Sequence, residues 1–130
     1  MNDDVKTKWV TALRSGKYQQ TQGRLRAGDG QSFCCLGVLC DLYVKATPGV
    51  LWDGYYSGGK LLGESNYLPK EVIEWAGLPI RGTHEDKECL IPNPVVNPNP
   101  FNPKAIKSLA IANDHGMTFP EIAAIIREQF

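Results

Sequence analysis

Hydrophobic residues recur at helical spacing near the start of the chain, between Asp4 and Ser15. They are Val5, Trp9, Ala12 and Leu13. The residues between them are mostly polar, so this segment is predicted to form an amphipathic helix with one buried face. Asp3 or Asp4 can cap the start of this helix, and Gly16 can follow its end.

The strongest hydrophobic block runs from Ser32 to Tyr43. Apolar residues occupy most of its helical faces, which predicts a buried central helix from about Cys34 to Lys45. Gly37 would allow another backbone to approach this helix closely. The block also holds three of the four cysteines, Cys34, Cys35 and Cys40.

Turn-forming residues separate short segments that are predicted to be extended. Residues 27–30 are a turn signal, so residues 18–26 and 31–33 are predicted to form a short hairpin. Residues 50–62 combine aromatic residues with glycines, which favours a second small hairpin or an ordered loop. Residues 79–103 are rich in proline and asparagine, and we expect an extended, partly mobile loop there.

Three further helices are predicted in the second half of the chain. Residues 67–77 should form a short helix with Pro69 in its first turn. Another helix is predicted over residues 103–114. The last helix follows a capping box, in which the side chains of Thr118 and Glu121 each bond the other residue's backbone amide.

The composition fits one compact domain. The chain has 130 residues, of which 42% are hydrophobic, enough for one core. We therefore expect a single α+β domain over residues 1–130, mostly helical, with about five short helices and one or two small β-hairpins. No stretch looks long and apolar enough to cross a membrane, and residues 1–4 lack the apolar core of a secretory leader. A cytoplasmic protein with reduced thiols is expected.

Residue types that could carry chemistry are present, but their spacing favours packing. The candidate zinc ligands, or thiols with a partner base, are Cys34, Cys35, Cys40, Cys89, His84 and His115. Adjacent cysteines diverge on a helix, whereas structural zinc usually takes ligand pairs two to four residues apart. An apolar environment also raises the pKa of a thiol and makes it inert. We expect no metal, no cofactor and no catalytic residue, and cysteines that act as small buried hydrophobic residues.

Two other kinds of site are weaker alternatives. The acidic residues at 85–88 are better explained as a solvated loop than as paired catalytic carboxylates. The last two predicted helices resemble a helix-turn-helix, but residues 119–130 offer DNA few basic or amide groups, so a packed helical corner is favoured. The formal net charge of zero also argues against a nucleic-acid partner.

The basic residues are unevenly placed along the chain. Six of them, and no acidic residue, lie between Val5 and Gly28. Arginine can bind phosphate through paired donors, amides can bind the edge of a base, and aromatic rings can stack on it. These residues predict either a ligand-binding surface or only a solvated basic face beside core aromatics. The predicted ligand-binding residues are Arg14, Tyr18, Gln20, Arg24, Arg26, Trp52, Tyr55 and Tyr56.

Four blocks of the chain resemble those of a widespread family of small phage and prophage proteins. The blocks are Lys8–Tyr18, Phe33–Leu42, Leu68–Leu78 and Leu109–Ile126. Ala112 departs from the pattern of that family, in which leucine precedes Asn-Asp. The difference concerns packing, because no functional residue of the family is carried over to this position.

The resemblance implies an accessory protein in the cytoplasm of an infected host cell that counters host defence by binding. Sequestration of a small nucleotide-type signalling molecule is the favoured function. The alternative is a protein-binding inhibitor of a host or anti-phage effector, comparable to anti-CRISPR proteins. An enzyme that degrades the nucleotide is less favoured, because no general base has a suitable setting. We expect no membrane partner. The binding site could lie between the subunits of a homo-oligomer.

Overall fold

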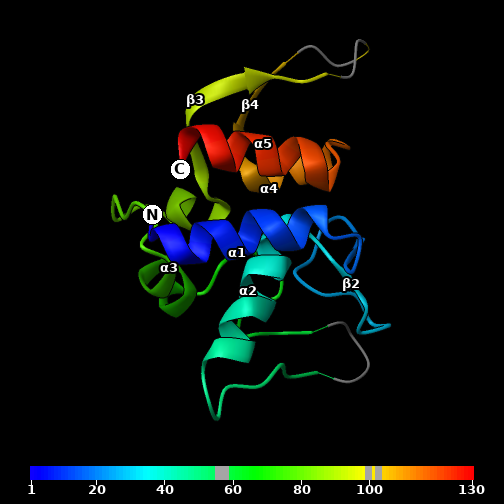
Figure 1. The fold of residues 1–130 in the computed structure, drawn as a ribbon, viewed down its shortest axis with the longest axis vertical. Coiled ribbons are helices and arrows are strands. Elements are labelled where there is room, and N and C mark those ends of the chain that lie inside the picture. The colour runs from blue at the N-terminus through cyan, green and yellow to red at the C-terminus, as the bar shows by residue number, and fades with distance from the viewer. Residues whose placement is uncertain (55–58, 99–100, 102–103) are drawn as a thin grey trace.

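The computed structural model describes residues 1–54, 59–98, 101 and 104–130 of the chain. The helices are α1 (Asp3–Arg14), α2 (Cys35–Ala46), α3 (Lys70–Ala76), α4 (Leu109–Asp114) and α5 (Phe119–Gln129). α1 and α5 lie side by side, and α2 runs across α1 (Figure 1). α3 and α4 pack against α2, so the central helix predicted from the hydrophobic block is confirmed.

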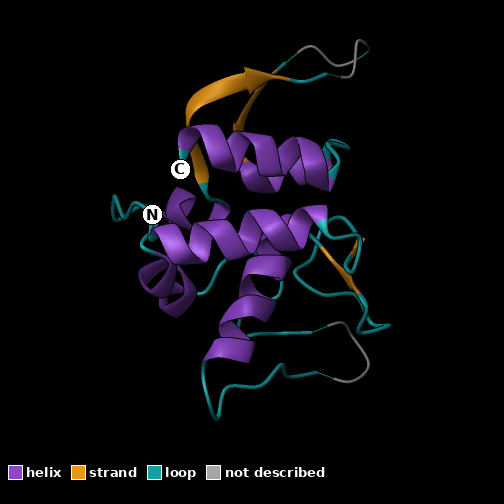
Figure 2. Cartoon of the chain, in the orientation of Figure 1, coloured by secondary structure: helices purple, strands orange, loops and turns teal. Residues whose placement is uncertain are grey.

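Strands lie at the periphery of this helical centre, as Figure 2 shows. They are β1 (Gln19–Gln20), β2 (Ser32–Phe33), β3 (Leu90–Val96) and β4 (Ala105–Ser108), and a 3-10 helix, η1, spans His84–Glu88. The described residues thus form five α-helices and two sheets of two strands each, which confirms the mostly helical α+β class.

One hydrophobic core joins the helices. Its largest fully buried side chains include Trp9, Leu36, Leu39, Ile122 and Ile126. The indole Nε1 of Trp9 donates to the carbonyl oxygen of Cys35 at 3.0 Å, so α1 is fixed to the start of α2 within the core. A buried indole needs such an acceptor, because an unpaired donor in the core costs about 1–3 kcal/mol.

Side-chain caps define where the first and last helices begin. The Thr118 and Glu121 capping box of α5 is confirmed. The predicted cap of α1 is wrong: Asn2, rather than Asp3 or Asp4, accepts from the amide of Val5 at 3.1 Å. The physical reason is the backbone of Asn2, which is extended, whereas both aspartates already lie in the first helical turn.

The hairpin predicted for residues 18–26 and 31–33 is confirmed only next to its turn, where Arg26 and Phe33 form an antiparallel bridge and the amide of Ala27 donates to Ser32 O at 2.8 Å. β1 pairs with β2 in parallel, with Gln20 opposite Phe33. After β1 the chain contacts residues 59–65: the amide of Leu25 donates to Ser65 O at 2.8 Å, and Arg26 forms a β-bridge with Gly59. The turn at residues 27–30 therefore forms as predicted, whereas residues 19–20 lie parallel to β2 and do not extend the antiparallel pairing.

The aromatic and glycine-rich segment does turn back on itself. Asp53 and Lys60 form an antiparallel bridge with backbone hydrogen bonds of 2.8 and 2.6 Å in the two directions. This agrees with the small hairpin or ordered loop expected over residues 50–62. Residues 55–58 between them lie outside the described part of the chain.

The proline-rich segment is more regular than predicted, because β3 lies within the loop expected over residues 79–103. β3 tolerates Pro92 and Pro94 because the pairing with β4 is irregular between Leu90 and Val95, where no ladder donor is required of them. The side chain of Gln129 bonds both the amide and the carbonyl of Asn93, at 2.8 and 3.0 Å.

The helix predicted over residues 103–114 starts later than expected. Residues 105–108 form β4, in which exposed and buried residues alternate, and the helix begins at Leu109. Ser108 ends the strand and caps the helix, because its hydroxyl accepts from the amide of Ile111 at 3.1 Å. The alternation of Ile106 and Ser108 with lysine and alanine was the sequence signal for a strand. Within the described residues, no helix combines the length and the apolar character needed to span a bilayer.

Candidate functional site

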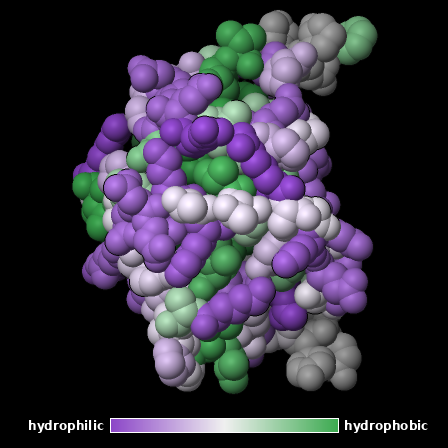
Figure 3. Space-filling model, viewed as in Figure 1, coloured by the Kyte–Doolittle hydropathy of each residue, from purple (hydrophilic) through white to green (hydrophobic). Residues whose placement is uncertain are grey.

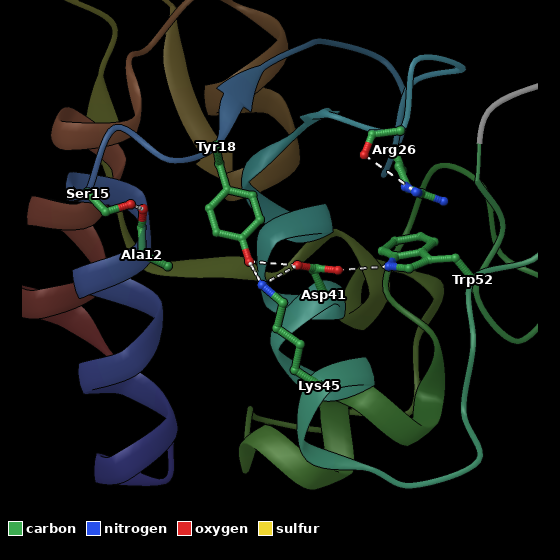
Figure 4. A network of polar contacts seen from close by, with 8 residues as sticks. Ala12, Ser15, Tyr18, Arg26, Asp41, Lys45 and Trp52 are labelled. Atoms are coloured by element: carbon green, nitrogen blue, oxygen red, sulfur yellow. Dashed lines mark hydrogen bonds and ion pairs between the residues drawn. The ribbon is translucent and has the colours of Figure 1, made fainter.

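A network of polar contacts surrounds Asp41, the acidic residue of α2 (Figure 4). Its carboxylate accepts from the Tyr18 hydroxyl at 2.6 Å and from the Trp52 indole at 3.0 Å. The ammonium of Lys45, one helical turn further along, lies 3.1 Å from the same carboxylate. Only 14% of the Asp41 side chain is exposed, so the three donors replace the water that a carboxylate would otherwise bind.

The network favours the protonated forms of Tyr18 and Lys45. Burial and the hydrogen bond to Asp41 raise the pKa of Tyr18, so its hydroxyl remains a donor at neutral pH. The hydrogen bond to Tyr18, followed by that to Asp41, raises the pKa of Lys45. Lys45 Nζ also lies 5.3 Å from the centroid of the Tyr18 ring, within cation–π range. The two side chains are therefore held in one arrangement.

Aromatic packing fixes the position of Trp52. Its ring contacts Phe33 edge-on, with centroids 6.0 Å apart, and Phe33 contacts Tyr18 in the same manner at 5.1 Å. Gly59 lies directly against the indole, because a Cβ there would be 2.9 Å from Trp52 Cε3 and 2.8 Å from Arg26 Cδ. Any larger residue at position 59 would push Trp52 and Arg26 out of place.

The guanidinium of Arg26 lies over the Trp52 ring, 5.5 Å from its centroid. Nη2 makes a long contact of 3.4 Å with the carbonyl of Gly30. Nε is buried, and none of the described residues accepts a hydrogen bond from it. A buried donor without an acceptor costs about 1–3 kcal/mol, so this Nε has an unmet need for an acceptor such as a water, an ion or a ligand oxygen.

Arg26 and Trp52 line an open hollow of about 460 Å³. The other lining residues are Ala27, Gly28, Asp29, Gly30, Val44, Leu51 and Gly54. Leu51 is 78% exposed and adds an apolar rim. Asp29 holds the adjacent loop: its carboxylate accepts from the amides of Gln31 and Ser32, which lowers the pKa of Asp29 and keeps it ionised.

The predicted ligand-binding residues divide among several surfaces. Tyr18, Arg26 and Trp52 come together around Asp41 and the hollow beside it. Arg14 lines a groove between α1 and α5, and Arg24 lines a separate hollow of about 180 Å³. The predicted residues Tyr55 and Tyr56 lie outside the described part of the chain.

Gln20, another predicted ligand residue, makes contacts within the fold. Its Nε2 donates to Asn113 Oδ1 at 2.9 Å and to the carbonyl of Met117 at 2.7 Å. The predicted set of ligand-binding residues did not include Asp41, Lys45 or the loop of residues 27–30. The i, i+4 spacing of Asp41 and Lys45 was a usable signal, because opposite charges at that spacing meet on one helical face.

The cysteines are buried free thiols. Burial raises the pKa of Cys34 to about 11 and also raises the pKa values of the other three. The sulfur of Cys34 accepts from the amide of Gly37 at 3.3 Å and so caps α2. In the part of the chain that the structure describes, no three His, Cys, Asp or Glu residues form a group that could hold a metal ion.

These features define a small α+β protein with a preformed hollow beside its central helix, lined by an arginine, a tryptophan and an aspartate. The chain belongs to the DUF8296 family, because the family model of this domain of unknown function matches residues 1–130. No curated protein and no solved structure matches the chain.

Proposed function

We propose that this protein binds a small nucleotide-type molecule in the Arg26–Trp52 hollow and sequesters it without chemical change. The observation that carries the proposal is the guanidinium of Arg26, which lies over an indole at the edge of this hollow. Arginine is the side chain best suited to phosphate, and an indole beside it can contact a base. A volume of about 460 Å³ lies in the range typical of small-molecule sites.

The rigidity of the site supports binding. Trp52 is held by Asp41, and Asp41 is held in turn by Tyr18 and Lys45. A ligand would therefore meet a side chain that is already ordered, and little conformational entropy would be lost on binding. Arg26 also brings a buried Nε to which a ligand oxygen could supply an acceptor.

Sequestration fits the lining residues better than catalysis does. Asp29 is the carboxylate that lines the hollow. It accepts hydrogen bonds from its own loop and has a lowered pKa, which makes it a weak general base. The resemblance to phage and prophage proteins suggests the setting: the bound molecule would be a host defence signal, and the protein would act in the cytoplasm of the infected cell.

Thermal shift against mono-, di- and triphosphate nucleosides and cyclic nucleotides tests the proposal. A ligand present at one hundred times its dissociation constant should add about 2.7 kcal/mol to the free energy of unfolding. Arg26→Gln should remove the shift, while its matched control Arg24→Gln, at the separate hollow, should retain it. The proposal fails if no nucleotide shifts the wild-type protein, or if the shift survives in a folded Arg26→Gln variant.

A further inference from the structure

The groove between α1 and α5 is the second place where cations gather. It has a volume of about 390 Å³ and is lined by Asp3, Lys6, Thr7, Val10, Thr11, Arg14 and Arg127. Three of these residues are cationic and one is acidic. Among the described residues, none of the three cations forms an ion pair, whereas Lys8, on the same helix, pairs with Asp4 at 3.1 Å. The groove therefore carries a net positive charge, which Asp3 offsets only in part.

The cations surround an apolar position. Lys6, Val10 and Arg14 follow one another at intervals of four residues along α1, so they share one side of the helix. Eight residues separate the two cations, which corresponds to about 12 Å along the helix axis. Val10 lies half-buried between them, and Arg127 lines the groove from α5. Figure 3 shows hydrophobic surface between hydrophilic side chains where the two helices meet.

The arrangement of three cations around one apolar position fits an acidic helix better than it fits other anionic ligands. Two helices that lie side by side present a groove into which a third helix can pack, with apolar residues on its central stripe. Nucleic acid fits poorly, because no aromatic side chain lines the groove and only three cations are available, whereas duplex binders commonly contact about 6–10 phosphates. A small anion could reach one cation but would not span about 12 Å of α1.

We propose that the α1–α5 groove binds an acidic amphipathic helix of a partner protein. The carboxylates of that helix would pair with Lys6, Arg14 and Arg127, and an apolar side chain between them would cover Val10. This surface is distinct from the Arg26–Trp52 hollow, because the two share no lining residue. The proposal therefore stands or fails independently of nucleotide binding.

The test uses a synthetic helical peptide with glutamates at positions i, i+4 and i+8 flanking a leucine stripe. The control peptide carries lysine in place of glutamate. Fluorescence anisotropy measures the binding of each peptide to the full chain, to the variant Lys6→Gln/Arg14→Gln/Arg127→Gln and to the control Lys60→Gln/Arg81→Gln/Lys104→Gln. The control variant loses the same number of positive charges as the groove variant, but at exposed residues outside the groove. Circular dichroism checks that both variants remain helical.

The expected result is that the acidic peptide binds the wild-type protein and the control variant, more weakly as salt rises, and that the lysine peptide does not. The groove variant should lose at least about tenfold in affinity, because several ion pairs disappear together. Equal affinity for the groove and control variants would overturn the proposal, since binding would then reflect overall charge. No binding of the acidic peptide, or tighter binding of a labelled DNA duplex in the same anisotropy assay, would overturn it as well.

Discussion

Gly37 is the residue at which the central helix meets another backbone most closely. A Cβ built there would lie 1.7 Å from the carbonyl oxygen of Leu25 and 2.6 Å from its carbonyl carbon. The same oxygen accepts from the amide of Cys34 at 3.3 Å, so the contact fixes the extended segment before Arg26 to the start of α2. Gly37→Ala should therefore destabilise the protein, although alanine favours helices over glycine.

The size of the effect follows from the geometry. Real Cβ contacts are essentially never shorter than 3.0 Å, so the two backbones must separate by the difference from 1.7 Å, about 1.3 Å. Such overpacking costs about 1–3 kcal/mol, and loss of the Cys34–Leu25 hydrogen bond costs about 1 kcal/mol more. The higher helix propensity of alanine offsets about 0.5–1 kcal/mol of this loss. We expect a net loss of about 1–3.5 kcal/mol from a total stability of about 5–15 kcal/mol.

Urea unfolding followed by far-ultraviolet circular dichroism measures this loss. The matched control is Ala46→Gly at the last residue of α2, which changes helix propensity without a close contact and should cost at most about 1 kcal/mol. Movement of Leu25 should also shift Arg26 away from Trp52 and change the tryptophan fluorescence. A Gly37→Ala protein as stable as the wild type, or more stable, would refute the reasoning.

Two further substitutions test the polar contacts around α2. Because the pKa of Tyr18 is raised in the folded protein, the stability that Tyr18 adds to the fold is complete below its ordinary pKa of 10.0 and is lost as the pH rises through the folded pKa. The difference in unfolding midpoint between wild type and Tyr18→Phe should therefore shrink above pH 10. A constant difference would count against the contact with Asp41. Asn113→Ala should cost about 2 kcal/mol or more in urea unfolding, because it leaves the backbone amide of Cys35 and the carbonyl of Thr21 without their partner and removes one of the two acceptors of the Gln20 side chain. A loss below about 1 kcal/mol would show that water replaces Asn113 easily.

Helices α1, α2, α3 and α5 were predictable because each depends on local signals. The hydrophobic spacing of α1 and α2, the glycine after α3 and the capping box of α5 all lie within a few residues of the element that they define. The parallel pairing of β1 with β2 could not be predicted in the same way. Gln20 is held by Asn113, which lies 93 residues away, and no short-range pattern records that contact.

The candidate site was predictable in its residue types and not in its grouping. Arg24 and Arg26 are nearly adjacent in sequence, yet they line different hollows. Each position is decided by a distant segment: Arg26 bridges Gly59 and lies over Trp52, while Arg24 shares its hollow with Asn66. Clustering of basic residues along the chain was therefore a poor guide to clustering in space.

The central helix links the core to the candidate site through one part-buried charge. α2 is otherwise almost wholly apolar toward the core, and the carboxylate of Asp41 could not be partly buried there without several donors. Tyr18, Lys45 and Trp52 satisfy that need, and Trp52 in turn supports Arg26. The packing of α2 and the geometry of the hollow are thus coupled, so substitutions that shift the helix should weaken the proposed ligand binding even where they touch no lining residue.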